Sequence, residues 1–267
     1  QLRGGVGMFT GQLPYVWMAN AFQYDGSRSR LAYCEGDAAP EFVPGAPAPT
    51  TCRNGAAPRE AGTVVAFSND FRYPRELKIS LAMDRELPWD LLLSVEGLWV
   101  STFARTTVRN RNLAPPGVPL DADYGLAFGE RTHYGQPTPY GYTPLRRVDG
   151  VGPVLEIGWE DRSANAYSGT VQLEKRFSSW FNLTGSYTWS VSNDVQSLTQ
   201  TDMVANLGAT PIGRNANEFT PSPANFDRPR KAVLHARFRA PEAWGGTEMT
   251  LVYVGQSGAP YSYVYAQ

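Results

Sequence analysis

The sequence predicts an all-β protein, an antiparallel, up-and-down transmembrane β-barrel of which the chain supplies a partial sector of about seven strands. Seven stretches alternate apolar and polar residues with a period of two, as β-strands with two unlike faces do. The connections between them alternate strictly between long and short. Several stretches also run to roughly 11 residues or more, whereas strands of soluble proteins average ~5–6. We therefore expect residues 1–267 to be part of one outer-membrane β-barrel domain.

The predicted strands are residues 2–10, 77–84, 89–100, 167–177, 181–192, 231–238 and 248–256. The fifth shows the alternation most clearly. One of its faces carries apolar and aromatic residues such as Leu183 and Tyr187, and the other carries small polar residues such as Thr184 and Ser186. No stretch of comparable length has a helical period, so no long helix is expected.

The connections place all long loops at one end of the predicted sheet. Long loops are expected at about 11–75, 104–155 and 194–225, and short turns near 85–88, 178–179 and 240–246. Outer-membrane barrels have this arrangement, with short turns in the periplasm and long loops outside the cell.

A soluble β-sandwich also has one apolar face on each strand, so the tryptophans decide between the two folds. Each predicted short turn has a tryptophan at its edge, and Trp89 and Trp99 stand ten residues apart on one face. At ~3.3 Å per residue and ~40° of tilt, ten residues rise about 25 Å, the height of the apolar band of a barrel. Leu93 is then expected near the middle of the membrane. The apolar face is predicted to meet lipid and the polar face to meet the lumen.

These faces give two sets of predicted residues. The lipid-facing and aromatic-girdle residues are Trp89, Leu91, Leu93, Val95, Trp99, Phe177, Trp180, Phe181, Leu183, Tyr187, Trp189 and Trp244. The lumen-facing residues are Lys78, Glu96, Gln172, Glu174, Arg176, Thr184, Ser186, His235 and Arg237.

Ligand contacts are expected in the long loops, where aromatic side chains gather with few charges. The candidates are Tyr15, Trp17, Tyr134, Tyr140 and Tyr142. Tyrosine and tryptophan offer large contact areas at a low cost in conformational entropy. An equally good interpretation is that these rings pack loop against loop and close the mouth of the barrel.

Composition and cysteine content limit the classes of partner. The 24 Lys and Arg residues balance the 25 Asp and Glu residues, so the electrostatic case for binding nucleic acid is absent. Cys34 and Cys52 lie in one Pro- and Gly-rich stretch and are either disulfide-bonded or free thiols. A pair in such a segment favours the disulfide and an oxidising compartment.

The sequence contains no recognisable catalytic set, and we expect neither an enzyme nor a cofactor nor a metal site. His235 lies beside Lys231 and Arg237 on the polar face, which indicates a lumenal lining rather than a catalytic base. Because some outer-membrane barrels are hydrolases, an enzyme stays open as an alternative, as does a non-transporting surface barrel or adhesin.

Four segments carry a resemblance to a known family. These are LRGGVGMFTGQLPYVWMANAF, FRYPRELKISLAMDRELPWDLLLSVEGLWV, AYSGTVQLEKRFSSWFNLTGSYTWSVSNDV and NFDRPRKAVLHARFRAP with the following GGTEMTLVYVGQSGAPYSYVY. Their order resembles the C-terminal half of Oar-like TonB-dependent receptors from the outer membrane of Gram-negative bacteria. The Cys34–Cys52 loop is not part of the resemblance.

The resemblance implies a 22-stranded barrel that encloses a plug domain and transports an unidentified substrate, possibly a peptide or protein, across the outer membrane. The implied partners are outer-membrane lipid, the plug domain, the remaining barrel strands, and the TonB complex, which would act through an upstream segment outside this sequence. An odd strand count and two apolar edge strands agree with a sector of a larger barrel, which we therefore expect not to close alone.

Overall fold

The computed structural model describes residues 1–26, 34, 36–53, 62–114, 147–148, 151–161, 164–210 and 217–262, and the backbone of four short strands between 118 and 144. Its long strands are β1 (Leu2–Thr10), β3 (Arg75–Leu87), β4 (Leu91–Asn110), β9 (Val151–Glu160), β10 (Ala164–Arg176), β11 (Phe181–Asp194), β13 (Arg230–Arg239) and β14 (Glu248–Gln256). Shorter strands are β2 (Gly62–Phe67), β5 (Val118–Pro119), β6 (Thr132–His133), β7 (Gly135–Thr138), β8 (Gly141–Pro144) and β12 (Ser222–Pro223). The helices are α1 (Tyr15–Gln23), α3 (Met203–Ala209), and the 3₁₀ helices η1 (Gly36–Ala38) and η2 (Glu242–Trp244).

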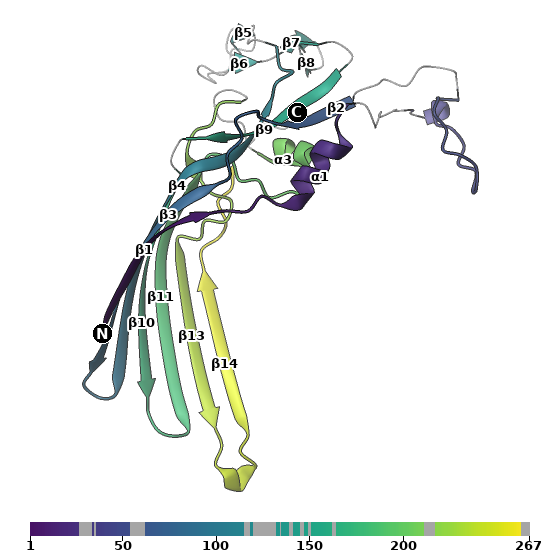
Figure 1. Cartoon of the computed structure of the whole chain (residues 1–267). Coiled ribbons are helices and arrows are strands. Elements are labelled where there is room, and N and C mark those ends of the chain that lie inside the picture. Colours follow the sequence, from purple (N-terminus) through teal and green to yellow (C-terminus); the bar gives the residue numbers. More distant parts are fainter. Residues whose placement is uncertain are drawn as a thin grey trace.

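Seven strands form the body of one antiparallel sheet, in the order β1-β3-β4-β10-β11-β13-β14 (Figure 1). Along this path the strands follow one another in chain order, as the up-and-down pattern predicts, and β2, β9 and β12 pair beside the path. The all-β antiparallel fold and the seven strands read from the sequence are thus confirmed. Short turns lie at one end of the sheet and long connections at the other, and we call these the turn end and the loop end.

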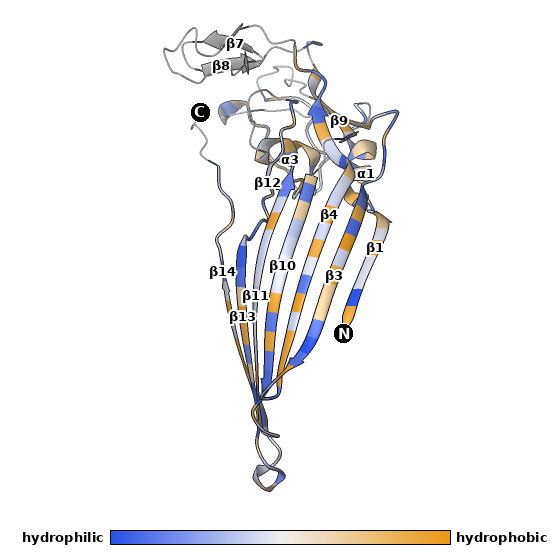
Figure 2. Cartoon of the chain, turned by 90° about the vertical axis from the view of Figure 1, so that its left-hand side faces the viewer, coloured by the Kyte–Doolittle hydropathy of each residue, from blue (hydrophilic) through white to orange (hydrophobic). Residues whose placement is uncertain are grey.

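The register places apolar residues in continuous rows on one face of the sheet. Ile79 lies opposite Trp99, and Trp99 lies opposite Tyr167. On the other face, Ala82 lies opposite Glu96, which lies opposite Thr170. Figure 2 shows this alternation of hydrophobic and hydrophilic residues along β3, β4 and β10. The predicted lipid-facing strand residues share the first face, the apolar face, and the predicted lumen-facing residues share the second, the polar face.

The band of apolar residues crosses the sheet diagonally. One row runs from Leu2 through Met83, Val95, Val171, Tyr187 and Ala232 to Gly255. On β3 this row lies at the turn-end limit of the band, because Met83 is followed by Arg85 on the same face, whereas on β13 it lies at the loop-end limit, because Ala232 follows Arg230. The band therefore shifts by about the six residues from Leu77 to Met83 over the four steps from β3 to β13. Ideal spacings give roughly 20 Å along the strands against 19 Å across them, a tilt of about 45°, at the upper end of the range of membrane barrels.

The diagonal shifts the expected depth of Leu93 towards the turn end. This residue lies in the row next to Val95 on the turn side, and only Leu91 follows it on the apolar face of β4. The spacing of Trp89 and Trp99 was misleading because Trp89 is not in a strand. Trp89 and Asp90 form the β3–β4 turn with positive φ values of 68° and 57°.

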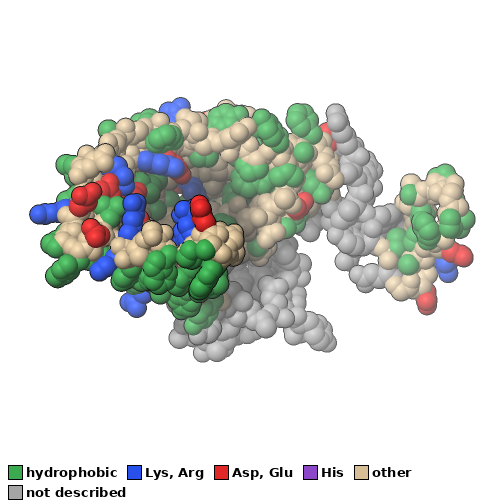
Figure 3. Space-filling view, turned by 90° about the horizontal axis from the view of Figure 1, so that it is seen from below, with side chains coloured by type: hydrophobic (Ala, Val, Ile, Leu, Met, Phe, Trp, Pro, Cys, Tyr) green, Lys and Arg blue, Asp and Glu red, His purple; other side chains and the backbone are tan. Residues whose placement is uncertain are grey.

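The turns also lie slightly away from their predicted positions. Residues 88–90 connect β3 to β4, 177–180 connect β10 to β11, and 240–247 connect β13 to β14 through η2. Trp180 and Trp244 are exposed in the last two turns, in keeping with their predicted place at the edge of the band. Figure 3, viewed from the turn end, shows charged side chains of both signs gathered over the lower ends of the strands.

The long connections contain more regular structure than their sequences predict. β4 continues to Asn110 and β9 begins at Val151, inside the segment 104–155 that was expected to be a loop. The other two segments hold α1, η1 and β2, and α3 and β12. α1 and α3 were missed because each is only two turns long, too short for a helical period to be recognised. In the described part of the chain, neither helix has the length or the apolar character to cross a membrane.

Candidate functional site at the loop end of the sheet

The loop end is built on an extension of β4 beyond the body of the sheet. Thr102 is the last β4 residue to pair with β10, and from Arg105 to Asn110 β4 pairs with β9. β9 and β10 thus act as one interrupted strand along β4. β2 joins the far side of β9 in parallel, which the sequence did not predict. Gly152 permits this approach, because a Cβ atom there would lie 2.6 Å from the backbone oxygen of Gly62.

A small hydrophobic core joins this extension to the two helices α1 and α3. It consists of Leu13, Trp17, Val65, Val108, Leu155, Ile157 and Met203. Leu155, Ile157 and Met203 are completely buried. The loop end is therefore a packed unit at one end of the sheet.

Side-chain amides attach α3 to α1. The indole nitrogen of Trp17 donates to the Gln200 carbonyl at 3.0 Å. Asn20 donates to the Thr201 carbonyl at 3.3 Å, and its oxygen accepts from the Met203 backbone at 3.0 Å. Asp202 caps α3 by accepting from the Ala205 amide at 3.0 Å. Two segments more than 180 residues apart in sequence are thus held by buried, directional contacts.

The free edge of the β4 extension is closed by two side chains that take the place of a strand. The Gln196 amide oxygen accepts from the Val108 N–H at 2.7 Å, and its nitrogen donates to the Val108 carbonyl at 3.4 Å. Asn217 makes the same pair of bonds with Asn110, both at 2.8 Å. Asn217 has a φ of 63°, a conformation that asparagine tolerates better than most residues. These two amides leave no unpaired backbone at Val108 or Asn110 for another chain to join.

Asn112 fixes the opposite side of the β4 extension. It is 3% exposed, and its amide donates to the carbonyls of Val148, Val151 and Gly152. Its oxygen accepts from the Val148 N–H at 2.9 Å. The Asn112 side chain thus fixes the backbone at Val148 and at the first residues of β9.

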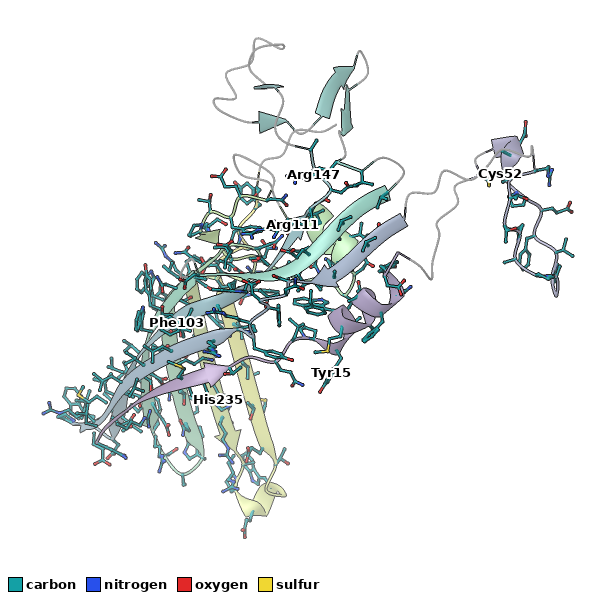
Figure 4. The ribbon with its side chains drawn as sticks, turned by 45° about the horizontal axis from the view of Figure 1, so that its top comes forward. Tyr15, Cys52, Phe103, Arg111, Arg147 and His235 are labelled. Atoms are coloured by element: carbon teal, nitrogen blue, oxygen red, sulfur yellow. A yellow bond between two sulfur atoms is a disulfide. The ribbon has the colours of Figure 1, made fainter. Side chains whose placement is uncertain are left out.

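Arginines on the other face of the extension are matched by acids. Arg105 pairs with Asp194, Arg109 with Glu160, and Arg111 with Glu156 (Arg111 and Arg147 are labelled in Figure 4). The Arg111 guanidinium donates to Glu156, and this hydrogen bond raises the pKa of Arg111 above its ordinary value. The ladder is neutral overall and stabilises the extension rather than attracting an ion.

Ser68, Asp70 and Arg72 make further contacts in the segment between β2 and β3. The hydroxyl of Ser68 donates to the Asp70 carboxylate, and this bond is the main reason that the pKa of Asp70 lies below its ordinary value. The Arg72 guanidinium lies 4.2 Å from the centroid of the Trp159 ring. These contacts order the segment between β2 and β3.

The structure separates the predicted ligand-binding aromatics. Tyr15 is 72% exposed at the start of α1, and its hydroxyl accepts from Gln12 (Figure 4). Trp17 is only 8% exposed and belongs to the core, so loop packing is its role. Tyr134 and Tyr140 lie outside the described residues, and only the backbone of Tyr142, in β8, is described.

Cys34 and Cys52 are joined by a disulfide with a Cα–Cα distance of 5.6 Å. Among the described residues, His, Cys, Asp and Glu form no cluster that could hold a metal ion. His235 is half-buried on the polar face, in a row with Thr184 and Val252 and far from the loop end (Figure 4).

The sequence had little chance of revealing the residues that build this end. Gln196, Asn217, Asn112 and Asn20 act on backbone groups far away in sequence, and no local pattern marks such contacts. The one available signal was the number of Asn and Gln residues in segments predicted to be loops.

A tilted antiparallel sheet with one apolar face, one polar face, short turns and ordered long loops defines the class of outer-membrane β-barrels. The family model described as outer membrane beta barrel domain matches residues 1–267, and the chain belongs to this family. Its location is therefore the outer membrane of Gram-negative bacteria. A search of curated proteins and a search of solved structures found no match.

Proposed function

We propose that this chain is part of the barrel of a TonB-coupled outer-membrane transporter similar to the Oar-like receptors, and that its polar face surrounds a plug domain. The observation that carries the proposal is the charge on this face. Arg3 and Asp84 pair at 2.9 Å, Lys78 and Glu76 at 3.1 Å. Most of these side chains are partly exposed, as they would be against a hydrated, polar partner.

The middle of the polar face has a different chemistry. Along β10 and β11 it carries neutral residues, and the hydroxyls of Thr170 and Thr188 lie 2.9 Å apart. Charges return at Glu174 and Arg176 near the turn end and at Asp194 near the loop end. A neutral polar strip between charged flanks suits a plug that must shift and a peptide or protein substrate that must pass without being held.

The two edges of the sheet support a larger barrel. Val6 on β1 and Tyr253 on β14 are 71% and 62% exposed on the apolar face. Both strands lack a neighbour on one side among the described residues. Hydrocarbon does not tolerate unpaired backbone, so further strands of the same barrel would have to complete both edges.

The test uses single cysteines in the whole protein, in cells. Ser186→Cys lies on the polar face, and Tyr187→Cys lies beside it on the apolar face as a matched control. A membrane-impermeant, water-soluble thiol reagent should label Ser186→Cys slowly at rest and faster when substrate is present and the TonB complex is energised. Deletion of the TonB complex should abolish the increase, and Tyr187→Cys should not respond.

Labelling of Ser186→Cys that is the same with and without the TonB complex would contradict the proposal. It would favour the alternative of a non-transporting surface barrel or adhesin.

A further inference from the structure

The charged residues of the apolar face lie just outside the diagonal band. In the seven-stranded part of the sheet they are Arg75 and Arg85 on β3, Lys175 on β10 and Arg230 on β13. Arg85 is the next apolar-face residue after Met83, towards the turn end, and Lys175 likewise follows Leu173. Arg75 and Arg230 lie towards the loop end.

Arg85 and Lys175 lie at the same height. Arg85, Leu93 and Leu173 form one row, and Lys175 lies two residues further towards the turn end. The band descends by one to two residues at each strand step, and two steps separate β3 from β10. Both cations therefore stand close to the turn-end boundary of the apolar band, with only Leu87 beyond Arg85 on the apolar face of β3. This is the level at which the band meets the headgroups of the periplasmic leaflet.

Neither cation has an acidic partner in the part of the chain that the structure describes. Asp84 and Glu86, the acids that flank Arg85, alternate to the polar face, and Asp84 pairs with Arg3. The Lys175 ammonium lies 4.9 Å from the centroid of the Phe177 ring, which orients it without neutralising it. Each cation can extend along the apolar surface to reach an anion at the headgroup level.

The surface between the two cations has the size of one lipid. Ideal strand spacings place their Cα atoms roughly 12 Å apart, so that two long side chains could bracket one headgroup. From Leu93 to Trp99, along the β4–β10 seam, six residues rise roughly 15 Å, about half of a ~30 Å hydrocarbon core. Gly97 and Gly169, paired in this seam, leave room above it, since a Cβ on Gly169 would meet nothing within 4 Å.

We propose that Arg85 and Lys175 bind the phosphate of one phospholipid of the periplasmic leaflet, whose acyl chains lie along the β4–β10 seam. The site is independent of any transport activity, because it requires only that the chain spans the outer membrane.

The experiment measures lipid binding to the whole protein in detergent by native mass spectrometry, with phosphatidylglycerol as the probe. Arg85→Gln and Lys175→Gln should each weaken binding about fivefold, and the double variant roughly 25- to 30-fold, since each cation near a membrane surface contributes about 1 kcal/mol. The matched control is Lys78→Gln, which removes a cation from the polar face of β3 and should leave binding unchanged. Arg85→Lys should retain most of it.

Three results would overturn the proposal. The double variant could bind phosphatidylglycerol as tightly as the unaltered protein, Lys78→Gln could weaken binding equally, or diacylglycerol, which lacks the phosphate, could bind as well and respond to the same variants. A loss confined to lipopolysaccharide would also overturn it, because it would place the site in the outer leaflet. An unchanged heat-modified band on gels shows for each variant that the barrel is folded.

Discussion

The diagonal course of the apolar band predicts how the cost of a buried charge varies along a single hydrogen-bonded row. Met83, Val171 and Ala232 lie in the same row, on β3, β10 and β13. Because the band descends from β1 to β14, Met83 lies near its turn-end limit, Val171 near its middle and Ala232 near its loop-end limit. A sheet whose rows lay parallel to the membrane would instead place all three at one depth.

Arginine at these three positions should therefore give unequal losses of stability. Val171→Arg should lower the free energy of unfolding by about 2–4 kcal/mol, the cost of arginine at the midplane on the lipid face of a barrel. Met83→Arg and Ala232→Arg should cost about 0–1 kcal/mol, as arginine does near the interfaces. Gln172→Arg, next to Val171 but on the polar face, should cost little and serves as the matched control.

The assay is reversible guanidinium unfolding of the whole protein in lipid vesicles, followed by tryptophan fluorescence. Each arginine variant is compared with alanine at the same position, or with the unaltered protein at Ala232, so that lost packing is not counted. Equal costs at all three positions would refute the diagonal band. A cost at Gln172 as large as at Val171 would mean that the two faces are assigned the wrong way round.

Three further predictions concern the loop end. Asn112→Ala should destabilise it by about 1–3 kcal/mol, because backbone carbonyls around its buried amide lose their donor, and limited proteolysis before β9 would report the loss. Trp17→Ala should cost about 3–5 kcal/mol through the cavity it leaves, whereas Tyr15→Ala should be nearly neutral; equal thermal shifts would contradict the division between core and surface. Thiol labelling of intact, unreduced cells should not modify Cys34 or Cys52, because the two are joined in a disulfide. In the chain-entropy model, closing this loop stabilises the folded state by about 3 kcal/mol.

The sheet could be predicted because each of its strands carries its own evidence. Leu183 and Thr184 point to opposite faces whatever their neighbours do, so a period of two reveals both the strand and its faces. The tilt could not be predicted in this way, since it depends on the register between strands. The sequence suggested the height of the band from Trp89 and Trp99 within one strand. The tilt instead follows from the register, which puts Met83 of β3 and Ala232 of β13 in one row at opposite limits of the band.

The loop end was largely unpredictable for a related physical reason. Its stability comes from contacts between segments distant in sequence, such as Asn217 with Asn110 and Trp17 with Gln200. A helix of two turns such as α3 has little intrinsic stability and forms because Asn20 and the core fix it. Aromatic content alone could not divide Tyr15 from Trp17, because the division depends on which side of α1 meets β4 and β9.

The two ends of the sheet close their strand edges by different means, and this contrast bears on what surrounds them. At the loop end, water is available and the chain still covers β4 with the amides of Gln196 and Asn217. Within the apolar band, β1 and β14 show no such covering among the described residues, although unpaired backbone is far more costly in hydrocarbon than in water. Side-chain amides cannot satisfy the backbone hydrogen bonds along a whole edge strand, but a neighbouring strand of the same barrel can. The edges of this sheet therefore favour a larger barrel, in which β1 and β14 pair with further strands.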